Sequence, residues 1–437
     1  MALGGGNWVA QNKVLPGTYA NFVSTERAFS VDTERGIVTV PYVGEWGATG
    51  EVVSLTAEEF SRHSPSILGY AWDAPEMREF REIYRHSRLV HFYRLNSGGV
   101  KATAPLATAK YVGERGNDLA YVISANVDDP TAFDVVTLLD NIAIDRQVVP
   151  FGETPADNGL LVWDENATLI VTPTAGTPLT GGSSVPVTNG DHLNYLDAIE
   201  SYHFHAMACP SDNPTLISTY AEYNRRMRNE RGIKFELVCY NPTDNSDFEG
   251  VRDVLNTVTD GGTYSLVYWM AGIVAGTTVN ASAMNTIYDG EYTVNANFTQ
   301  TQLEQAKLGG KLALHRVGSD YRILADINSL QTVTAEKNED FKQGQTIRVI
   351  DHVAYADASI FANKYIGNIP NDQDGRVSLW VDLVKIREDL QTLRAIQNFE
   401  SSDVEIEPGE TPRSVFVRSA IQPTHAMEQL YMVNYIN

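Results

Sequence analysis

From Ser402 to Asn437 the chain reads SDVEIEPGETPRSVFVRSAIQPTHAMEQLYMVNYIN. Apolar and charged or small residues alternate in two short runs, and Pro408-Gly409 between them supplies a turn. This pattern predicts two strands joined by a tight connection. The apolar positions of the two strands are Val404, Ile406, Val415, Val417 and Ile421.

The segment from Ala426 to Ile436 has a different pattern, which predicts a third strand that is apolar on both faces. Glu428 is its only charged residue. A strand of this kind needs cover on both sides, yet it lies at the end of the sequence. We therefore expect it to pair with another molecule. Its apolar positions are Met427, Leu430, Tyr431, Met432, Val433, Tyr435 and Ile436.

The opposite end of the chain is also nearly uncharged, with Lys13 as the single charge in residues 1–24. One interpretation is a strand held on its own domain, and the other is an arm that packs on a neighbouring molecule. The uncharged segment at the C-terminal end favours the arm. Its main apolar positions are Val14, Tyr19, Phe22 and Val23.

Composition limits the possible classes of function. The net charge of −22 over 437 residues argues against a nucleic-acid-binding protein, which would need a basic face. Two cysteines, Cys209 and Cys239, exclude a disulfide framework and favour reduced thiols in a reducing cytoplasm. No signal peptide and no apolar run of about 20 residues is visible, so membrane insertion is not expected.

The length predicts more than one domain, and the residue composition changes along the chain. We expect an α/β multidomain protein with extended N- and C-terminal arms. A segment rich in Thr, Val, Gly and Pro, bordered by Gly/Ser stretches, predicts an inserted all-β domain. The expected divisions are an arm (1–24), the first part of an α/β core (25–96), the insertion (97–187), the second part of the core (188–330) and an α+β C-terminal domain (331–437).

Nearly continuous apolar runs predict the strands of the core. We expect strands at 202–209, 233–240 and 264–270, alternating with helices at 214–231 and 247–258. This order is typical of a mostly parallel sheet covered on both faces. In the C-terminal domain, periodic apolar residues predict two long helices, at 345–365 and 376–397.

The sequence offers little chemistry, and we predict no catalytic, cofactor-binding or metal-binding residues. His203 and His205 share one face of a predicted strand with His192 nearby, which is typical of a metal site or, more often, of structural histidines. The alternative function is a hydrolase-like α/β enzyme that uses this pair or two carboxylates.

A basic cluster lies on the predicted helix at 214–231. It indicates either a solvated helix end or a contact with an acidic neighbour. The cluster consists of Arg225, Arg226, Arg228 and Arg231.

The run YWMAGIVAGT at 268–277, followed by VNAS at 279–282, resembles a segment of contractile tail sheath proteins. The C-terminal order agrees: Ile350-Asp351-His352 in a long helix, then Ile369-Pro370-Asn371, a second helix and closing strands. The resemblance is greatest to sheaths of Gram-positive myophages, defective prophages and R-type bacteriocins. It covers 186–437 well and the first 95 residues moderately.

The resemblance implies a structural subunit and no enzyme, and an inserted domain at 97–187 that faces outward. It implies stacked hexameric rings that form a helical polymer around a tail tube, contact baseplate and tail-terminator proteins, and contract to drive the tube through a cell envelope. It also implies that the N-terminal arm and the C-terminal strand add to the strands at 404–407 and 415–421 of neighbouring copies. Another phage shell protein or a surface-layer protein is a third interpretation.

Overall fold

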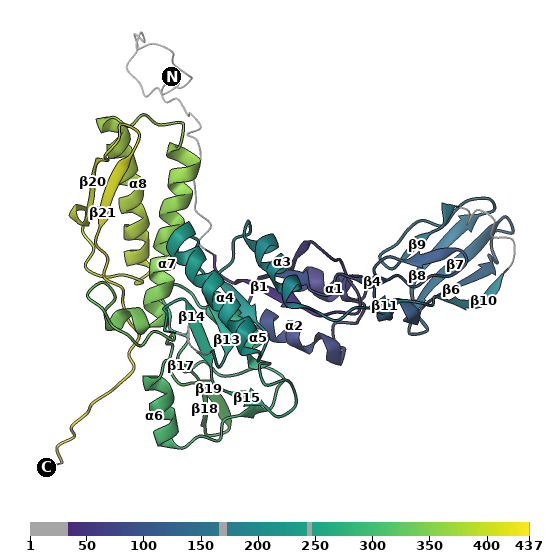
Figure 1. Ribbon diagram of the computed structural model, residues 1–437, viewed down its shortest axis with the longest axis horizontal. Coiled ribbons are helices and arrows are strands. Elements are labelled where there is room, and N and C mark those ends of the chain that lie inside the picture. Colours follow the sequence, from purple (N-terminus) through teal and green to yellow (C-terminus); the bar gives the residue numbers. More distant parts are fainter. Residues whose placement is uncertain (1–33, 166–172, 243–246, 437) are drawn as a thin grey trace, which may run out of the picture.

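The computed structural model describes residues 34–165, 173–242 and 247–436 (Figure 1). The predicted N-terminal linking residues Val14, Tyr19, Phe22 and Val23 lie outside these ranges. Within them the chain is a mixed α/β protein of several parts, as the sequence pattern predicts.

A seven-stranded sheet forms the centre of the molecule. All neighbouring strands are parallel except the antiparallel pair β3 and β2, which confirms the predicted parallel arrangement. In order across the sheet the strands are β17 (Lys311–Leu312), β14 (Val251–Val254), β13 (Glu236–Tyr240), β12 (Ala206–Cys209), β1 (Ile37–Tyr42), β3 (Leu89–Arg94) and β2 (Val52–Thr56).

Helices cover both faces of this sheet, each packed on alternate strand residues. One face carries α1 (Ala57–Leu68), α2 (Arg78–Tyr84) and α5 (Leu266–Gly276), and the other carries α3 (Asn189–Ile199) and α4 (Pro214–Arg226). Local signals set the helix ends. Thr56 and Glu59 form a capping box at α1, and α4 continues as a π-helical turn that stops at left-handed Gly232.

Two of the predicted core elements are wrong. Most of the expected strand at 264–270 belongs to α5, which is buried almost all round and so lacks the one-sided pattern that marks a surface helix. The small residues of α5 allow close packing against α2. A Cβ on Gly272 would lie 2.6 Å from the Ile83 carbonyl oxygen of α2, so only glycine permits this approach.

The expected helix at 247–258 is instead β14 followed by the short strand β15 (Thr257–Val258), which pairs with β16 (Val294–Asn295). Arg252 and Asp253 give this stretch a charged, helix-like pattern. Both side chains are buried, and ion pairs with other segments neutralise them. Tertiary contacts therefore decide the conformation here.

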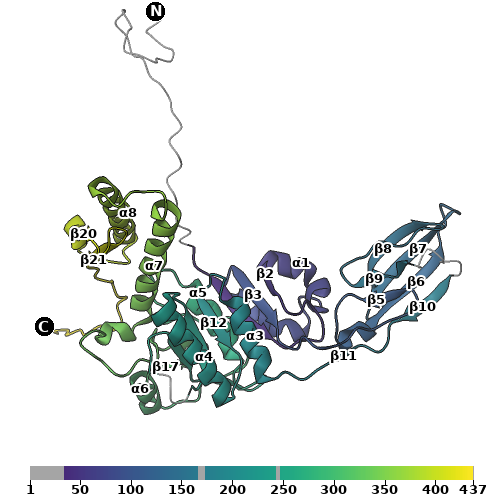
Figure 2. The ribbon, with the colours of Figure 1, turned by 45° about the horizontal axis from the view of Figure 1, so that its top comes forward.

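The region between β3 and α3 is rich in strands and projects away from the central sheet (Figure 2). Its elements are β4 (Gly99–Val100), β5 (Ala107–Ala109), β6 (Leu119–Ala125), β7 (Ala132–Leu139), β8 (Ile142–Pro150), β9 (Leu161–Trp163), β10 (Thr174–Pro178) and β11 (Ser183–Ser184). It has its own hydrophobic cluster, which also receives Trp46 from the loop after β1. The Trp46 indole donates to the Ser66 carbonyl at 3.1 Å, so this region is fixed to the core.

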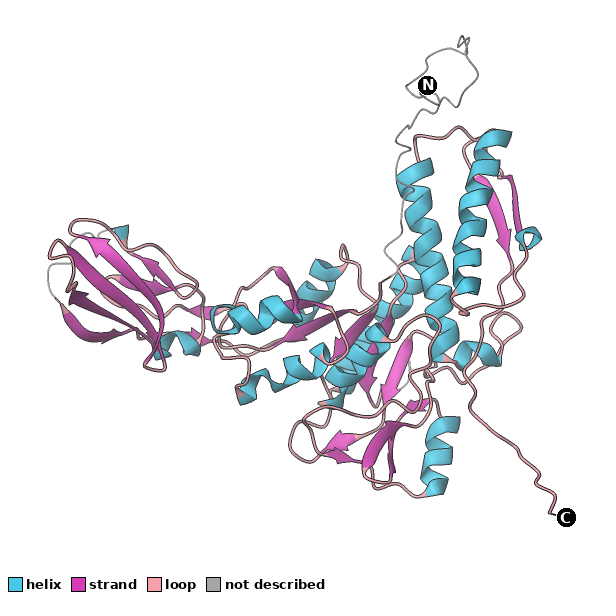
Figure 3. Ribbon diagram, turned by 180° about the vertical axis from the view of Figure 1, so that it is seen from behind, coloured by secondary structure: helices cyan, strands magenta, loops and turns pink. Residues whose placement is uncertain are grey.

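The C-terminal region consists of two long helices and a hairpin (Figure 3). Helix α7 (Gly344–Ile360) continues as a π-helical turn to Tyr365, α8 (Gln373–Thr392) packs beside it, and β20 (Val404–Pro408) pairs with β21 (Val415–Ser419). The remaining elements are α6 (Gln300–Leu308), β18 (Leu314–Val317) and β19 (Asp320–Ile323).

Candidate subunit-linking surface

The hairpin of β20 and β21 contains four of the predicted receiving positions, and the fifth, Ile421, follows β21. Val404 is buried, and Ile406, Val415, Val417 and Ile421 pack partly buried against the cluster between α7 and α8. The opposite face of the hairpin is charged, because Arg418 lies beside both Glu405 and Glu407. One face of the hairpin is thus covered, and a further strand could be added only along one of its two edges.

The two edges of the hairpin differ. Bonds from Ala420 N to the Asp403 carbonyl and from Gly409 N to the Ser414 carbonyl close its two ends. Since bonded pairs alternate along an antiparallel ladder, the backbone polar groups at 404 and 406 point out of one edge and those at 415 and 417 point out of the other.

The edge of β20 is partly blocked, and the edge of β21 is open. The Trp380 indole donates to the Val404 carbonyl at 2.8 Å, and Pro408 has no N–H to offer. No backbone bond reaches Val415 or Val417 from any other segment within 34–165, 173–242 and 247–436. An open edge that lies on a packed hairpin is a suitable template for a further strand.

The C-terminal tail, which we define as residues 429–436, runs away from the body of the molecule in every view (Figures 1 and 3). It forms no strand within the described chain, so its predicted pairing with another molecule stays a prediction. Its large apolar side chains are 67% to 98% exposed, far more than a folded chain usually tolerates in one place. They are Leu430, Tyr431, Met432, Val433, Tyr435 and Ile436.

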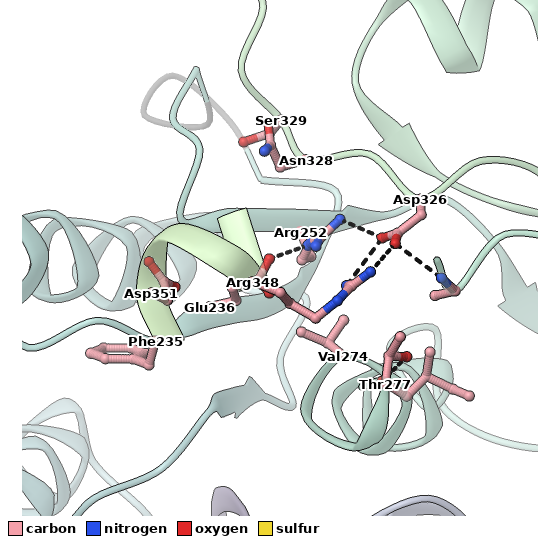
Figure 4. Close-up of polar contacts among 12 residues, drawn as sticks. Phe235, Glu236, Arg252, Val274, Thr277, Asp326, Asn328, Ser329, Arg348 and Asp351 are labelled. Carbon is pink, nitrogen blue, oxygen red and sulfur yellow. Dashed lines mark hydrogen bonds and ion pairs between the residues drawn. The ribbon is translucent and has the colours of Figure 1, made fainter. Parts of the chain in front are cut away.

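The C-terminal helices are fixed to the central sheet by a buried ionic cluster, the Asp326 hub (Figure 4). Arg252 on β14 and Arg348 on α7 both donate to the Asp326 carboxylate, and Arg252 also donates to Glu236 at 2.5 Å. The backbone N–H of Ala283 adds a bond to Asp326 at 3.0 Å. At most 3% of any of the four charged side chains is exposed.

The electrostatics of the hub depend on this pairing. Burial by itself would raise the pKa of Asp326, but the charges of Arg348 and Arg252 and their hydrogen bonds hold it well below its ordinary range. Asp326 is therefore ionised at any physiological pH. A charge buried this completely stabilises only while its partners stay in place.

A second ion pair lies beside the hub and revises our interpretation of the basic cluster. Arg228 is buried and makes a bidentate contact with Asp351 of α7, at 2.7 Å for both bonds. It is not part of a solvated helix end. Arg225 lies over the Phe248 ring and Arg226 over the Tyr223 ring, while Arg231 is exposed.

The histidines are structural contacts. The His203 ring stacks on Tyr355 of α7 with centroids 4.0 Å apart, and His205 Nδ1 accepts from the Ile37 N–H at 3.3 Å. His192 bonds instead to the Tyr220 hydroxyl at 2.8 Å. In the described ranges no three His, Cys, Asp or Glu side chains are placed to share a metal ion.

The two cysteines lie at facing positions of β12 and β13. Cys209 and Cys239 are both free and buried. Burial raises the pKa of both thiols, which leaves them unreactive. None of the helices in the described part of the chain combines the length and apolar character that a bilayer crossing requires.

Sequence reasoning did not find the Asp326 hub. The pairs that contact one another in it are separated by 16, 22 and 74 positions in the sequence, and no local period connects them. One signal was available: Arg252 and Asp253 sit between valines in a stretch that is otherwise buried.

Comparison with known proteins assigns most of the chain. Three family models match: the phage tail sheath protein beta-sandwich domain at residues 97–185, the phage tail sheath protein central domain at 186–329 and the phage tail sheath C-terminal domain at 336–437.

Individual proteins resemble the whole chain. A sheath tail protein of Desulfitobacterium hafniense with a known crystal structure is 32% identical, with a TM-score of 0.80 over 95% of this chain and 99% of that chain. The phage-like element PBSX protein XkdK of Bacillus subtilis strain 168 is 29% identical over 99% of this chain and 100% of that protein. The helical sheath of the anti-feeding prophage in its contracted state shares the fold, with 10% identity, a TM-score of 0.58, and 97% and 99% of the two chains covered.

Proposed function

Because the chain belongs to the phage tail sheath family, we propose that it polymerises as stacked hexameric rings around a tail tube. Contraction of this sheath would drive the tube through a cell envelope. The subunit is a structural part of a phage-tail particle and would be made in the bacterial cytoplasm. Its partners would be further copies of itself, the tube protein, and the baseplate and tail-terminator proteins.

The observation that carries the proposal is the apolar C-terminal tail together with the open edge of β21. We propose that the tail of one copy adds to the hairpin of a neighbour by β-strand addition, with Val415 and Val417 on the receiving edge. Main-chain bonds supply the affinity in this mode of recognition. A link through a flexible tail also tolerates rotation of the two bodies that it joins. The N-terminal arm with Val14, Tyr19, Phe22 and Val23 would supply a second link.

The proposed division of labour follows the domains expected from the sequence. The strand-rich segment at 97–187 would face outward, and the core at 25–96 and 188–330 would carry subunit contacts. The unit at 331–437 would hold the linking hairpin. Contraction needs no nucleotide, because a few kcal/mol gained per subunit becomes decisive when it is summed over a long polymer; each 1.4 kcal/mol is about a tenfold change in equilibrium.

Truncation tests the proposal. We expect a chain that ends at Glu428 to fold with unchanged stability and to remain monomeric, whereas the full chain forms sheath-like tubes in negative-stain electron microscopy. A chain of full length whose last nine residues alternate Gly and Ser is the matched control and should fail in the same way. Tubes formed by either variant would exclude the tail as the link.

A further inference from the structure

The stretch at 420–428, which leads from β21 to the tail, is hydrogen-bonded to the body of the molecule. The Gln397 N–H donates to the Gln422 carbonyl at 2.9 Å, and the Thr424 N–H donates to the Ala395 carbonyl at 3.0 Å. These bonds hold the stretch against the loop after α8. The chain then crosses to the ends of two further helices.

At that crossing three side chains of the body hold the base of the tail. The Thr346 hydroxyl bonds to His425 Nε2 at 2.8 Å, and Gln345 Oε1 accepts from the Ala426 N–H at 3.1 Å. Lys307, in the last turn of α6, forms an ion pair with Glu428 at 3.1 Å. We call Lys307, Gln345 and Thr346 the tail clamp.

The clamp is itself fixed in place. Gln345 is 5% exposed, and its amide nitrogen donates to the Asn280 carbonyl at 3.3 Å, so its oxygen is oriented toward the tail. The Asn280 side chain in turn donates to the Leu393 carbonyl at 2.9 Å. The base of the tail is therefore fixed to the core and to the C-terminal helices at once.

We infer that the tail clamp sets the point and the direction in which the C-terminal strand leaves the subunit, so that it is presented to one neighbouring copy of this chain. This inference rests on the proposed strand exchange. With the clamp closed, the free segment starts at Gln429 and its nine residues reach about 30 Å at most. With the clamp open, the bonds at Gln422 and Thr424 remain, so the free segment starts at His425 and its end explores a larger volume.

The physical effect is on effective concentration. A short segment that leaves in a fixed direction meets its receiving edge more often than a long segment with free orientation. The ion pair has a second effect, because Glu428 is the only charge between Ala426 and Ile436. Lys307 keeps this carboxylate at the body of a protein of net charge −22 and leaves an uncharged strand for the joint.

A charge swap tests the clamp. The variants are Lys307→Glu, the swap Lys307→Glu with Glu428→Lys, and Lys364→Glu as a control. Lys364 forms an ion pair with Asp382, and the two pairs have similar exposure: 43% and 23% against 40% and 28% for Lys307 and Glu428. The control thus removes an equivalent pair that does not touch the tail.

The first measurement is made on the soluble subunit and does not depend on assembly. Nitroxide labels at Met432→Cys and Thr301→Cys report the distance between the tail and α6, and the native cysteines are buried and do not compete for the label. We expect Lys307→Glu to widen this distance distribution at least twofold, and the swap to restore it. An unchanged distribution in Lys307→Glu, or no restoration by the swap, would overturn the clamp.

The second measurement is the rate of polymerisation by light scattering. We expect a decrease of about fivefold for Lys307→Glu, recovery to within about twofold for the swap, and no decrease for Lys364→Glu. Suppose that Lys307→Glu widens the distance distribution but neither the wild type nor any variant polymerises. The clamp is then supported, and strand exchange is contradicted. If the wild type polymerises and Lys307→Glu matches its rate, the role of the clamp in assembly is contradicted.

Discussion

The Asp326 hub and the C-terminal tail both depart from the usual rule that charged side chains are exposed and large apolar side chains are buried. The hub places four charged side chains where at most 3% of each is exposed. The tail places large apolar side chains in solvent, at 67% to 98% exposure. The hub is complete within one chain, because each charge in it has a partner of opposite sign. The apolar side chains of the tail belong to none of the hydrophobic clusters formed by the described residues.

The hub and the tail serve different purposes: the hub fixes parts of one chain to each other, and the tail is available to another chain. A buried and fully paired ionic cluster fixes the relative position of the elements that contribute to it, and removal of any member is costly. An exposed apolar strand contributes little to the folding of its own chain, so it remains available to another. The protein joins its own parts with charge and would join copies of itself with backbone and apolar contacts.

The largest expected effect is on the hub. Asp326→Asn leaves Arg252 and Arg348 buried, with Glu236 as the one remaining carboxylate of the hub. We expect this change to lower the free energy of unfolding by about 3–5 kcal/mol. Urea denaturation followed by circular dichroism measures the loss. Asp389→Asn, which removes an exposed partner of Lys385, is the control and should change stability by about 0.5 kcal/mol or less. A loss below about 1 kcal/mol for Asp326→Asn would mean that the hub does not hold the parts together.

An intermediate effect is expected from pH, at the seam between the central sheet and α7. Burial lowers the pKa of His205, and the nearby charges of Arg35, His203, Arg88 and His352 lower it further. Only the unfolded chain then takes up this proton, so stability decreases as pH falls below about 6.5, by about 1.4 kcal/mol per pH unit. The low pKa of Asp326 puts its own loss of stability far below this range.

Unfolding curves between pH 7 and pH 5 measure this slope. We expect His205→Gln, which keeps an acceptor for the Ile37 N–H, to flatten it by the contribution of one proton. Equal slopes for the wild type and His205→Gln would contradict a neutral His205 in the folded protein.

The smallest effect on stability is expected in the tail. Leu430→Asp with Met432→Asp should change the free energy of unfolding by about 0.5 kcal/mol or less, because both side chains are already exposed. The same variant should abolish polymerisation in sedimentation experiments, since two charges would enter the proposed joint. Val127→Asp, at an exposed apolar position far from the tail, controls for the added charge. A marked loss of stability would show that the tail packs on its own chain.

The elements of the central sheet show how far local pattern extends. The alternation of apolar strands with helices predicted the parallel sheet, because each of these signals lies within a few residues, as does the capping box of Thr56 and Glu59. The stretch at 264–270 was assigned wrongly, because an element buried on all sides carries no period. Arg252 was assigned to a helix for a related reason, since its partners Glu236 and Asp326 lie in other segments.

The sequence by itself therefore determined the class of fold and the unusual ends of the chain. The run at 429–436 has no charged residue and is largely apolar, which the side-chain types show without coordinates. Tertiary structure alone decided which edge of the hairpin is open, that Arg228 pairs with Asp351 rather than with solvent, and that Lys307 holds Glu428. Each of these depends on the approach of residues far apart in the chain, and local periodicity carries no information about such pairs.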